Sequence, residues 1–271
     1  MAKKIRDDMV NTSEAINESY MVSTLVRGMK ILSTFTEARP ALKVSEIAEI
    51  THFDNATVFR FVYTLTQLGY LTVDEDTKRY RQAVRMLNLV LPARAGLPVR
   101  QVGVPLILEL SRNVNETIHL AILDGVEVVL LGTAEVSNKL VYSPSIGARS
   151  PSYCTALGKA VLAYQPVENL DKLISKIEFV RHTENTIVAP DKFRLELEKV
   201  RKQGYATEES ELIDGLNSLA VPIFARAGKV VGAINISSLS KERLLKEQKD
   251  YFLEELIKTS RSITTQLNSI S

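Results

Sequence analysis

A tight turn between two short apolar-patterned segments is the feature that most constrains how this chain folds. The segment before the turn, 45–51, has an apolar face formed by Val44, Ile47, Ala48 and Ile50. The turn is His52-Phe53-Asp54-Asn55, in which Asp54 or Asn55 can cap the helix that follows. In that helix, apolar residues recur at helical spacing until Gly69 ends it: Val58, Phe61, Val62, Leu65 and Leu68. The pattern therefore predicts two helices joined by a four-residue turn.

The flanking segments extend this unit on both sides. An earlier helix begins near Met21, ends before Pro40, and repeats apolar residues at steps of three and four: Leu25, Met29, Ile31, Leu32 and Phe35. After Gly69, the segments 71–73 and 79–81 flank the polar turn 74–78, which predicts a β-hairpin. The order helix, short helix, turn, helix, hairpin predicts a winged helix-turn-helix over residues 21–84.

The remaining chain divides into a tail, a linker and a second domain. Residues 1–20 are polar throughout and are expected to form a disordered tail. The segment 85–98, which contains Pro92, Gly96 and Pro98, is expected to be a linker, and 271 residues are comfortable for two domains. Residues 99–271 contain two hairpin patterns, one turning at Asp124-Gly125, with helical segments around them. This order predicts an α+β domain with an antiparallel sheet and flanking helices, beginning with a helix over 104–110.

Composition excludes several classes of function. Cys154 is the single cysteine, and the three histidines are far apart, so we expect no disulfide, no metal and no cofactor. The first twenty residues lack an apolar signal core, and no apolar run nears the roughly 18 residues of a membrane span, which places the protein in the cytoplasm. The net charge is only +2, so any affinity for nucleic acid must come from local placement of charge.

The helix after the turn carries side chains suited to reading DNA on the side opposite its apolar face. These are Asn55, Ala56, Thr57, Phe59, Arg60 and Tyr63. Arginine can read guanine, asparagine can read adenine, and alanine or threonine can touch thymine methyl groups. Thr57 can also hold a phosphate, and the predicted wing offers Lys78, Arg79 and Arg81 to phosphates or the minor groove. The alternative is a three-helix domain whose cations are merely solvated; the order of the elements favours double-stranded DNA as a partner.

Several motifs resemble the IclR family of bacterial regulators and cover nearly all the chain after the tail. They include 22–28, 44–48, 57–60, 65–70, 116–120, 147–151, 154–159 and 211–215. The resemblance implies a transcription regulator rather than an enzyme, with a GAF-like C-terminal domain that binds a small organic acid. It also implies homodimers, often paired into dimers of dimers. Two positions depart from the family pattern: His52 replaces a glycine in the turn, and Lys43 replaces a capping residue, so we expect the next helix to rely on Ser45 or water.

The resemblance also places an effector pocket. Matched motif by motif, its lining falls on Ala156, Leu157, Glu208, Ser218, Asn235 and Ser237. From the residues themselves, Asn235 and Ser237 alternate on one face of a strand and can point into one cavity. Ser150-Pro151 predicts a helix over 151–163 whose first turn suits a carboxylate, or is simply capped. A solvated acidic face over 208–211 is the alternative for Glu208, and the motifs leave sugar-acid and aromatic-acid effectors open.

Two other functions compete with this interpretation. A hydrolase or transferase would use Cys154 with His119 or His182 as its base. An interaction module would keep the helix-turn-helix but not bind DNA. Dimers would form through the first helix or the linker, whose candidate contact residues are Leu25, Met29, Leu32, Met86, Leu87, Leu89 and Val90.

Overall fold

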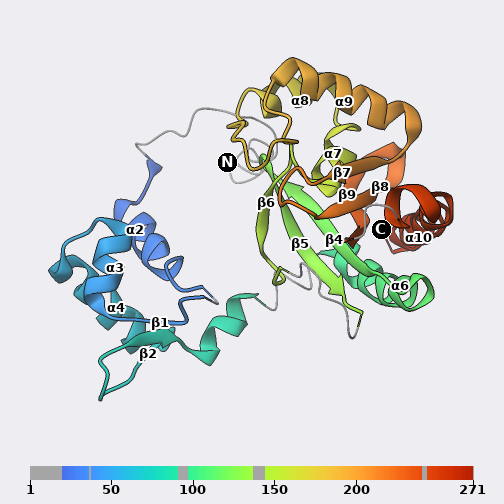
Figure 1. Ribbon diagram of the computed structural model, residues 1–271. Coiled ribbons are helices and arrows are strands. Elements are labelled where there is room, and N and C mark those ends of the chain that lie inside the picture. Colours follow the sequence, from blue (N-terminus) through green and yellow to red (C-terminus); the bar gives the residue numbers. More distant parts are fainter. Residues whose placement is uncertain (1–19, 37, 91–96, 137–143, 240–242, 271) are drawn as a thin grey trace, which may run out of the picture. The chain divides into compact units, whose positions relative to one another are not determined.

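The computed structural model describes residues 20–36, 38–90, 97–136, 144–239 and 243–270, in two compact units that divide after Ala93 (Figure 1). The regions expected as domains, 21–84 and 99–271, lie one in each unit. The expected tail lies outside the described residues up to position 19, as do residues 91–96 of the expected linker and a strand expected near 140–142. Within the described ranges, no helix is both long enough and apolar enough to cross a membrane.

The first unit confirms the predicted order of elements. Its helices are α2 (Ser23–Leu32), α3 (Val44–Thr51) and α4 (Asn55–Gln67). Its sheet has the order β1-β3-β2, formed by β1 (Ala41–Leu42), β3 (Tyr80–Gln82) and β2 (Leu71–Val73), all antiparallel. The short β1 was not predicted. The core draws on every helix and on β2, through Ile31, Ile47, Val58, Val62 and Leu71.

The turn between α3 and α4 is built as its residues predict. His52 adopts the left-handed conformation, with φ 58° and ψ 31°. Asp54 caps α4 because its Oδ1 accepts the backbone N–H of Thr57 at 2.8 Å and its Oδ2 accepts the Thr57 hydroxyl at 2.7 Å. Lys43 gives α3 no side-chain cap, and the Glu46 carboxylate accepts the backbone N–H of Lys43 at 2.6 Å. This bond satisfies the N–H of the capping residue itself, so the reliance of the first-turn N–H groups on Ser45 or water stays a prediction.

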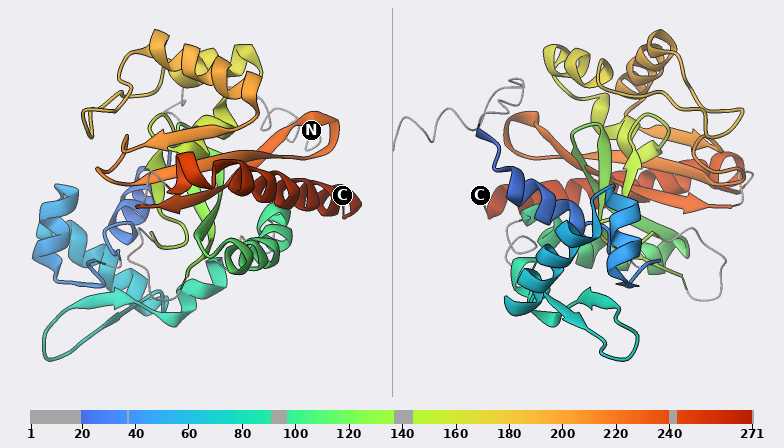
Figure 2. Two further views of the ribbon diagram at one scale, coloured as in Figure 1. Left: turned by 45° about the vertical axis from the view of Figure 1, so that its right-hand side comes forward. Right: turned by 90° about the vertical axis from the view of Figure 1, so that its left-hand side faces the viewer.

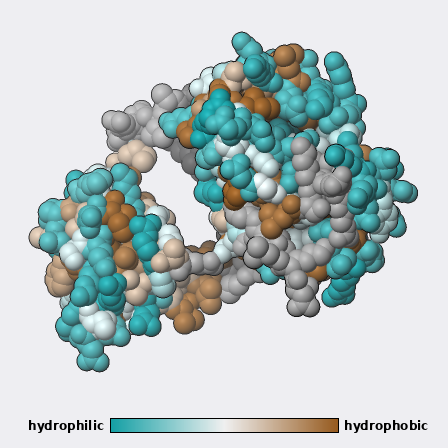
Figure 3. All heavy atoms as spheres, in the orientation of Figure 1, coloured by the Kyte–Doolittle hydropathy of each residue, from teal (hydrophilic) through white to brown (hydrophobic). Residues whose placement is uncertain are grey.

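The expected linker is helical where it is described. Val84–Met86 forms a 3-10 turn, residues 87–90 continue as helix, and Pro98 is the first residue of α6 (Pro98–Val114). Proline suits a first helical position because its missing N–H would be unpaired there anyway. The helix expected over 104–110 is therefore longer than its apolar pattern indicated. Figure 3 shows exposed apolar side chains on the turns after β3, where Leu87 and Leu89 are each more than half exposed.

The second unit is one antiparallel sheet between two helical layers (Figures 1 and 2). The strand order is β6-β5-β4-β9-β8-β7. The strands are β4 (Thr117–Asp124), β5 (Glu127–Ala134), β6 (Arg149–Pro151), β7 (Ala206–Glu209), β8 (Asn217–Phe224) and β9 (Val230–Ser238). One face packs on α6 and α10 (Lys249–Ser269), which lie side by side. The other face is covered by α7 (Ala156–Leu162), α8 (Val167–Ile174) and α9 (Pro190–Gln203).

The predicted helix over 151–163 begins later than expected. Ser150 and Pro151 belong to β6, which pairs with β5, and α7 starts at Ala156. Thr155 is its cap, since its hydroxyl accepts the N–H of Gly158 at 3.2 Å. A Cβ on Gly158 would lie 2.1 Å from the carbonyl oxygen of Ser152, so only glycine allows α7 to pack this closely on the preceding chain. The carboxylate site expected at a Ser150-Pro151 helix start is therefore not formed.

Candidate DNA-binding surface and effector cavity

The exposed face of α4 presents the side chains that were predicted to read DNA. Val58 and Val62 are buried in the core, which turns Asn55, Ala56, Phe59 and Arg60 outward. Tyr63 extends the same face, and its ring stacks on Phe59 with centroids 6.3 Å apart. Phe59 is 52% exposed and Tyr63 is 56% exposed, so both rings present apolar surface to solvent. The surface thus combines one cation, one amide and two aromatic rings.

Two of the predicted DNA contacts already have partners. The Thr57 hydroxyl donates a hydrogen bond to the Asp54 carboxylate. It can donate to a phosphate only if this hydrogen bond breaks. The Arg79 guanidinium forms two 2.9 Å hydrogen bonds with Glu46 and one of 2.8 Å with the carbonyl of Ala41. This side chain joins the wing to α3 and to β1. Contact between Arg79 and DNA stays a prediction. In the structure, the Arg79 side chain connects the wing to Glu46 and Ala41.

The rest of the wing is more open. Lys78 pairs with Glu75 at 2.9 Å, but 70% of its side chain is exposed. Arg81 lies 3.6 Å from Asp74 and is 55% exposed. Exposed ion pairs of this kind contribute little, so phosphates can compete for both cations.

All six residues predicted to bind the effector line one cavity in the second unit. The cavity holds about 50 Å³, and the predicted residues among its walls are Ala156, Leu157, Glu208, Ser218, Asn235 and Ser237. The other walls include Ala121, Val128 and Leu130 from the sheet, with Leu212 and Leu216 from the segment between β7 and β8. Ala156 and Leu157, in the first turn of α7, thus face the sheet across the cavity. Their role as ligand contacts remains a prediction.

Strand register explains why residues far apart in sequence meet here. Glu208 lies opposite Ser218, and Ser218 lies opposite Ser237, on three neighbouring strands. Side chains directly opposite in a sheet share a face, so the three form one row. Asn235 lies two residues before Ser237 and therefore faces the same side, opposite His119 of β4.

Hydrogen bonds connect this row into a chain. The Asn235 amide donates to the Ser237 hydroxyl at 2.9 Å, and the hydroxyls of Ser237 and Ser218 are 3.1 Å apart. Ser218 then donates to Glu208 Oε2 at 3.1 Å. The backbone N–H of Leu212 lies 3.4 Å from the other carboxyl oxygen of Glu208. The cavity therefore has one polar end, and apolar side chains form most of its other walls.

Glu208 is the buried acid at that end. Its side chain is 2% exposed, and this burial raises its pKa from 4.5 to about 7, because the charged form loses its hydration. The hydrogen bonds from Leu212 and Ser218 oppose the rise. The alternative of a solvated acidic face is wrong for Glu208 and for Glu211, both of which are buried.

A buried ion pair behind the cavity was missed by sequence reasoning. Lys159 of α7 is 1% exposed, and its ammonium lies 2.5 Å from the Glu211 carboxylate. The Glu211 carbonyl also accepts the Thr186 hydroxyl at 2.7 Å. Burial nevertheless raises the pKa of Glu211, with Lys159 acting against the rise. The pair joins α7 to the segment that supplies Leu212 and Leu216 to the cavity wall.

The geometry disfavours a cysteine nucleophile. Cys154 is fully buried, and burial raises its pKa to about 12, which keeps the thiol protonated. The His119 ring lies 3.2 Å from the Thr133 hydroxyl, and the His182 ring stacks on Tyr153. Neither histidine forms a hydrogen bond with Cys154 in the described structure. The part of the chain that is described holds no group of residues suited to a metal ion.

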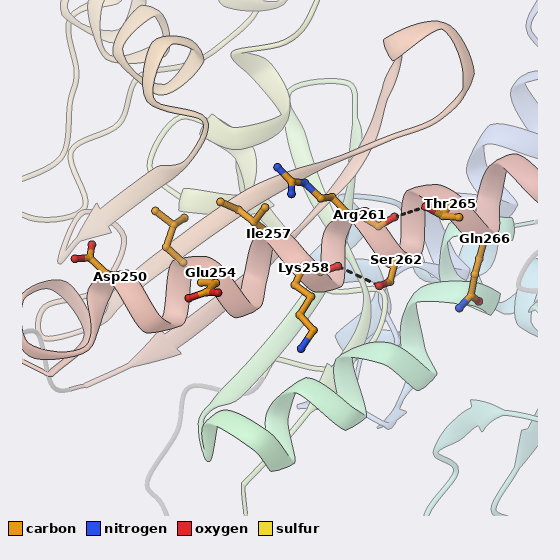
Figure 4. Close-up of a pocket in the computed structure, with 9 residues that line it drawn as sticks. Asp250, Glu254, Ile257, Lys258, Arg261, Ser262, Thr265 and Gln266 are labelled. Atoms are coloured by element: carbon orange, nitrogen blue, oxygen red, sulfur yellow. Dashed lines mark hydrogen bonds between the residues drawn. The ribbon is translucent and has the colours of Figure 1, made fainter.

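A second hollow lies along α10 (Figure 4). Its walls mix charged and polar side chains, such as Asp250, Lys258 and Arg261, with the apolar Leu253 and Ile257. All of them come from a single helix, so they form an open surface that does not enclose a ligand. The cavity lined by the sheet and α7, with its convergent polar groups, is therefore the better ligand site.

Three helices in helix-turn-helix order with a hairpin wing define a DNA-binding protein, and the second unit adds a cavity with one polar end. Residues 24–75 match the model described as the IclR helix-turn-helix domain. Residues 93–265 match the model described as bacterial transcriptional regulator IclR C-terminal. The chain belongs to the IclR family of bacterial transcriptional regulators, and it is a regulator rather than an enzyme.

Similar proteins agree in length and fold. The HTH-type transcriptional regulator KdgR of Escherichia coli is 29% identical over 246 residues, covering 91% of this chain and 93% of KdgR. The structure of a putative transcriptional regulator from Rhodococcus sp. RHA1 matches with a TM-score of 0.81 and 30% identity, covering 93% of this chain and 100% of that one. An IclR homolog from Microbacterium hydrocarbonoxydans, complexed with 4-hydroxybenzoate, matches with a TM-score of 0.79 and 24% identity over 90% of this chain and 98% of that one.

Proposed function

We propose that the protein binds an operator in double-stranded DNA through α4 and the wing, and that a small organic acid in the cavity controls this binding. The observation that carries the proposal is the convergence of six predicted residues on one cavity, in a unit separate from the helix-turn-helix. The acid changes operator affinity only if it favours one arrangement of the protein over another.

The effector is an aromatic or sugar-derived acid that the cell catabolises, and the regulated genes form a catabolic operon. The regulator itself acts in the cytoplasm. The 4-hydroxybenzoate bound to the Microbacterium homolog supports the aromatic class. The cavity holds about 50 Å³, which is room for a few water-sized groups. An aromatic ring therefore needs a wall to move, and the segment carrying Leu212 and Leu216 is outside the sheet.

The regulator acts as a homodimer or a dimer of dimers. Paired half-sites require paired recognition helices. Leu25 is 63% exposed and Met29 55% exposed on α2, and Leu87 and Val90 are exposed after the wing. These apolar residues support the two dimer contacts expected from the sequence, while Leu32 is half-buried within its own unit.

An Arg60→Ala variant tests the DNA-binding surface. Loss of one base-reading arginine costs about 1–3 kcal/mol, so operator affinity falls roughly 5- to 150-fold while acid binding is unchanged. Gln67→Ala, on an exposed residue at the far end of α4, is the matched control. The measurement is a mobility shift with the protein's own promoter region. Equal operator affinity in the Arg60→Ala variant would refute the assignment, and no sequence-specific, salt-sensitive shift at all would favour the interaction module.

Variants at the polar end of the cavity test the effector site. Asn235→Ala or Ser237→Ala removes a member of the hydrogen-bond chain and should weaken acid binding while leaving operator affinity intact. A thermal-shift screen of aromatic, aldonic and short-chain acids identifies the ligand class, because a bound acid raises the melting temperature. An acid that binds both cavity variants as tightly as the wild type would place the effector elsewhere.

A further inference from the structure

The polar end of the cavity poses a charge problem for a ligand that is an acid. Glu208 lies there on the edge strand β7 and is 2% exposed. Within the described ranges, its hydrogen bonds come from Ser218 and, at 3.4 Å, from the backbone of Leu212. Of the hydroxyl side chains that line the cavity, those of Ser218 and Ser237 lie next to this acid.

The charged groups around Glu208 do not neutralise it. The described residues that line the cavity include no lysine or arginine. Lys159 approaches from α7, but its ammonium is bound to Glu211 at 2.5 Å and lies within 3.9 Å of Glu196 of α9. Glu211 itself repels charge on Glu208.

The remaining titratable neighbours are a thiol and an imidazole. Cys154 precedes α7, and burial keeps its thiol protonated by raising its pKa to about 12. His119 of β4 lines the same cavity, with its Nδ1 3.2 Å from the Thr133 hydroxyl. Among the described residues that line the cavity, His119 and Glu208 are the ionisable side chains.

Two carboxylates that share a desolvated site cannot both be ionised at small cost, and one of them keeps a proton. We propose that Glu208 holds the carboxylate of the effector through a shared proton, so that the complex keeps one proton at this site and takes it from solvent whenever Glu208 is ionised before binding. This inference rests on the proposed function, because it assumes that the cavity binds an organic acid. It also assigns Glu208 a specificity role: the cavity selects monoanionic acids that can accept a hydrogen bond from a protonated carboxyl.

The size of the uptake follows from the titration of the ligand-free acid. With a pKa of about 7, Glu208 is mostly protonated at pH 6 and mostly ionised at pH 8. Proton uptake per bound acid is therefore about 0.1 at pH 6, 0.5 at pH 7 and 0.9 at pH 8. The apparent dissociation constant rises about tenfold between pH 6 and pH 8.

The test is isothermal titration calorimetry on the full chain, with each of four probes: acetate, pyruvate, gluconate and 4-hydroxybenzoate. Repeating each titration in buffers of different ionisation enthalpy gives the number of protons taken up. Glu208→Gln keeps the size and a hydrogen-bond donor but cannot titrate, so it should bind the same probe with no uptake and no pH dependence. His119→Gln is the parallel variant and should leave the uptake of the wild type unchanged.

Each outcome decides the inference. Uptake that rises from pH 6 to pH 8 and disappears in Glu208→Gln supports it. A probe that binds at pH 8 without proton uptake overturns it and leaves the proposed effector site standing. Uptake that disappears only in His119→Gln overturns it in favour of the imidazole. Failure of all four probes to bind at any pH from 6 to 8 overturns it together with the acid-binding part of the proposed function.

Discussion

Replacing Glu208 by glutamine should change how stability depends on pH, even without a ligand. The folded protein raises the pKa of this carboxyl from 4.5 to about 7, so the native state holds the proton more tightly than the unfolded chain. The stability associated with that proton is fully present below pH 4.5 and is lost as the pH rises through 7. One pKa unit corresponds to about 1.4 kcal/mol, which makes the total loss on the order of 3 kcal/mol.

The glutamine variant has no such loss. The free energy of unfolding of the variant, relative to that of the wild type, should therefore rise by about 2.5 kcal/mol between pH 5 and pH 8, because part of the wild-type loss occurs below pH 5. The chain contains no tryptophan, so urea unfolding is followed by far-ultraviolet circular dichroism at pH 5, 6, 7 and 8. Glu209→Gln is the matched control, because Glu209 is the next residue of β7, faces the opposite side and is only half-buried. Wild-type and Glu208→Gln curves that stay parallel across this range would refute the reasoning.

Two further substitutions test contacts that support the two surfaces. Asp54→Ala removes both hydrogen bonds to Thr57 and should destabilise the first unit by about 1 kcal/mol, measured by thermal unfolding; Asp54→Asn, which keeps an acceptor, should lose less, and equal losses would exclude capping as the cause. Lys159→Met leaves the Glu211 carboxylate buried without its cation and should cost about 3–5 kcal/mol in urea unfolding. Adding Glu211→Gln to it should recover most of that loss, and a double variant as unstable as the single one would contradict the ion-pair account.

The first unit was predictable because its signals are local. A cap, a left-handed turn residue and a helical apolar repeat each act over a few residues, and His52, Asp54 and Val58 lie as those signals indicate. What the local signals could not show was the third strand, β1, because Ala41 and Leu42 pair with β3 far along the chain. The same distance hid the role of Arg79, whose guanidinium turns inward to Glu46.

The start of α7 shows why a local signal can mislead. Serine followed by proline is typical of a helix N-terminus, but proline is also tolerated at an edge strand, where no ladder hydrogen bond needs its N–H. Pro151 lies in β6, which is an edge strand of the sheet. Only the pairing of β6 with β5 decides between the two structures, and that pairing is a tertiary contact.

The residues that line the cavity could be predicted from the sequence, but the burial and pairing of its charged groups could not. The alternation of Asn235 and Ser237 placed both on one face, whereas the row formed with Ser218 and Glu208 depends on the register of three strands. The burial of Glu208, and the buried pairing of Lys159 with Glu211, could not be read from residues that are usually exposed. These are the features from which the proton-linked binding of an acid follows.

The most direct test of the central claim is the operator dissociation constant measured by fluorescence anisotropy with and without a bound acid. The probe is a labelled fragment of the protein's own promoter region, and the acid is the one that gives the largest thermal shift. We expect the acid to change the wild-type constant at least several-fold and to leave the Ser237→Ala constant unchanged at the same concentration. An operator affinity that the acid does not alter in the wild type would contradict the account of a regulator switched through this cavity.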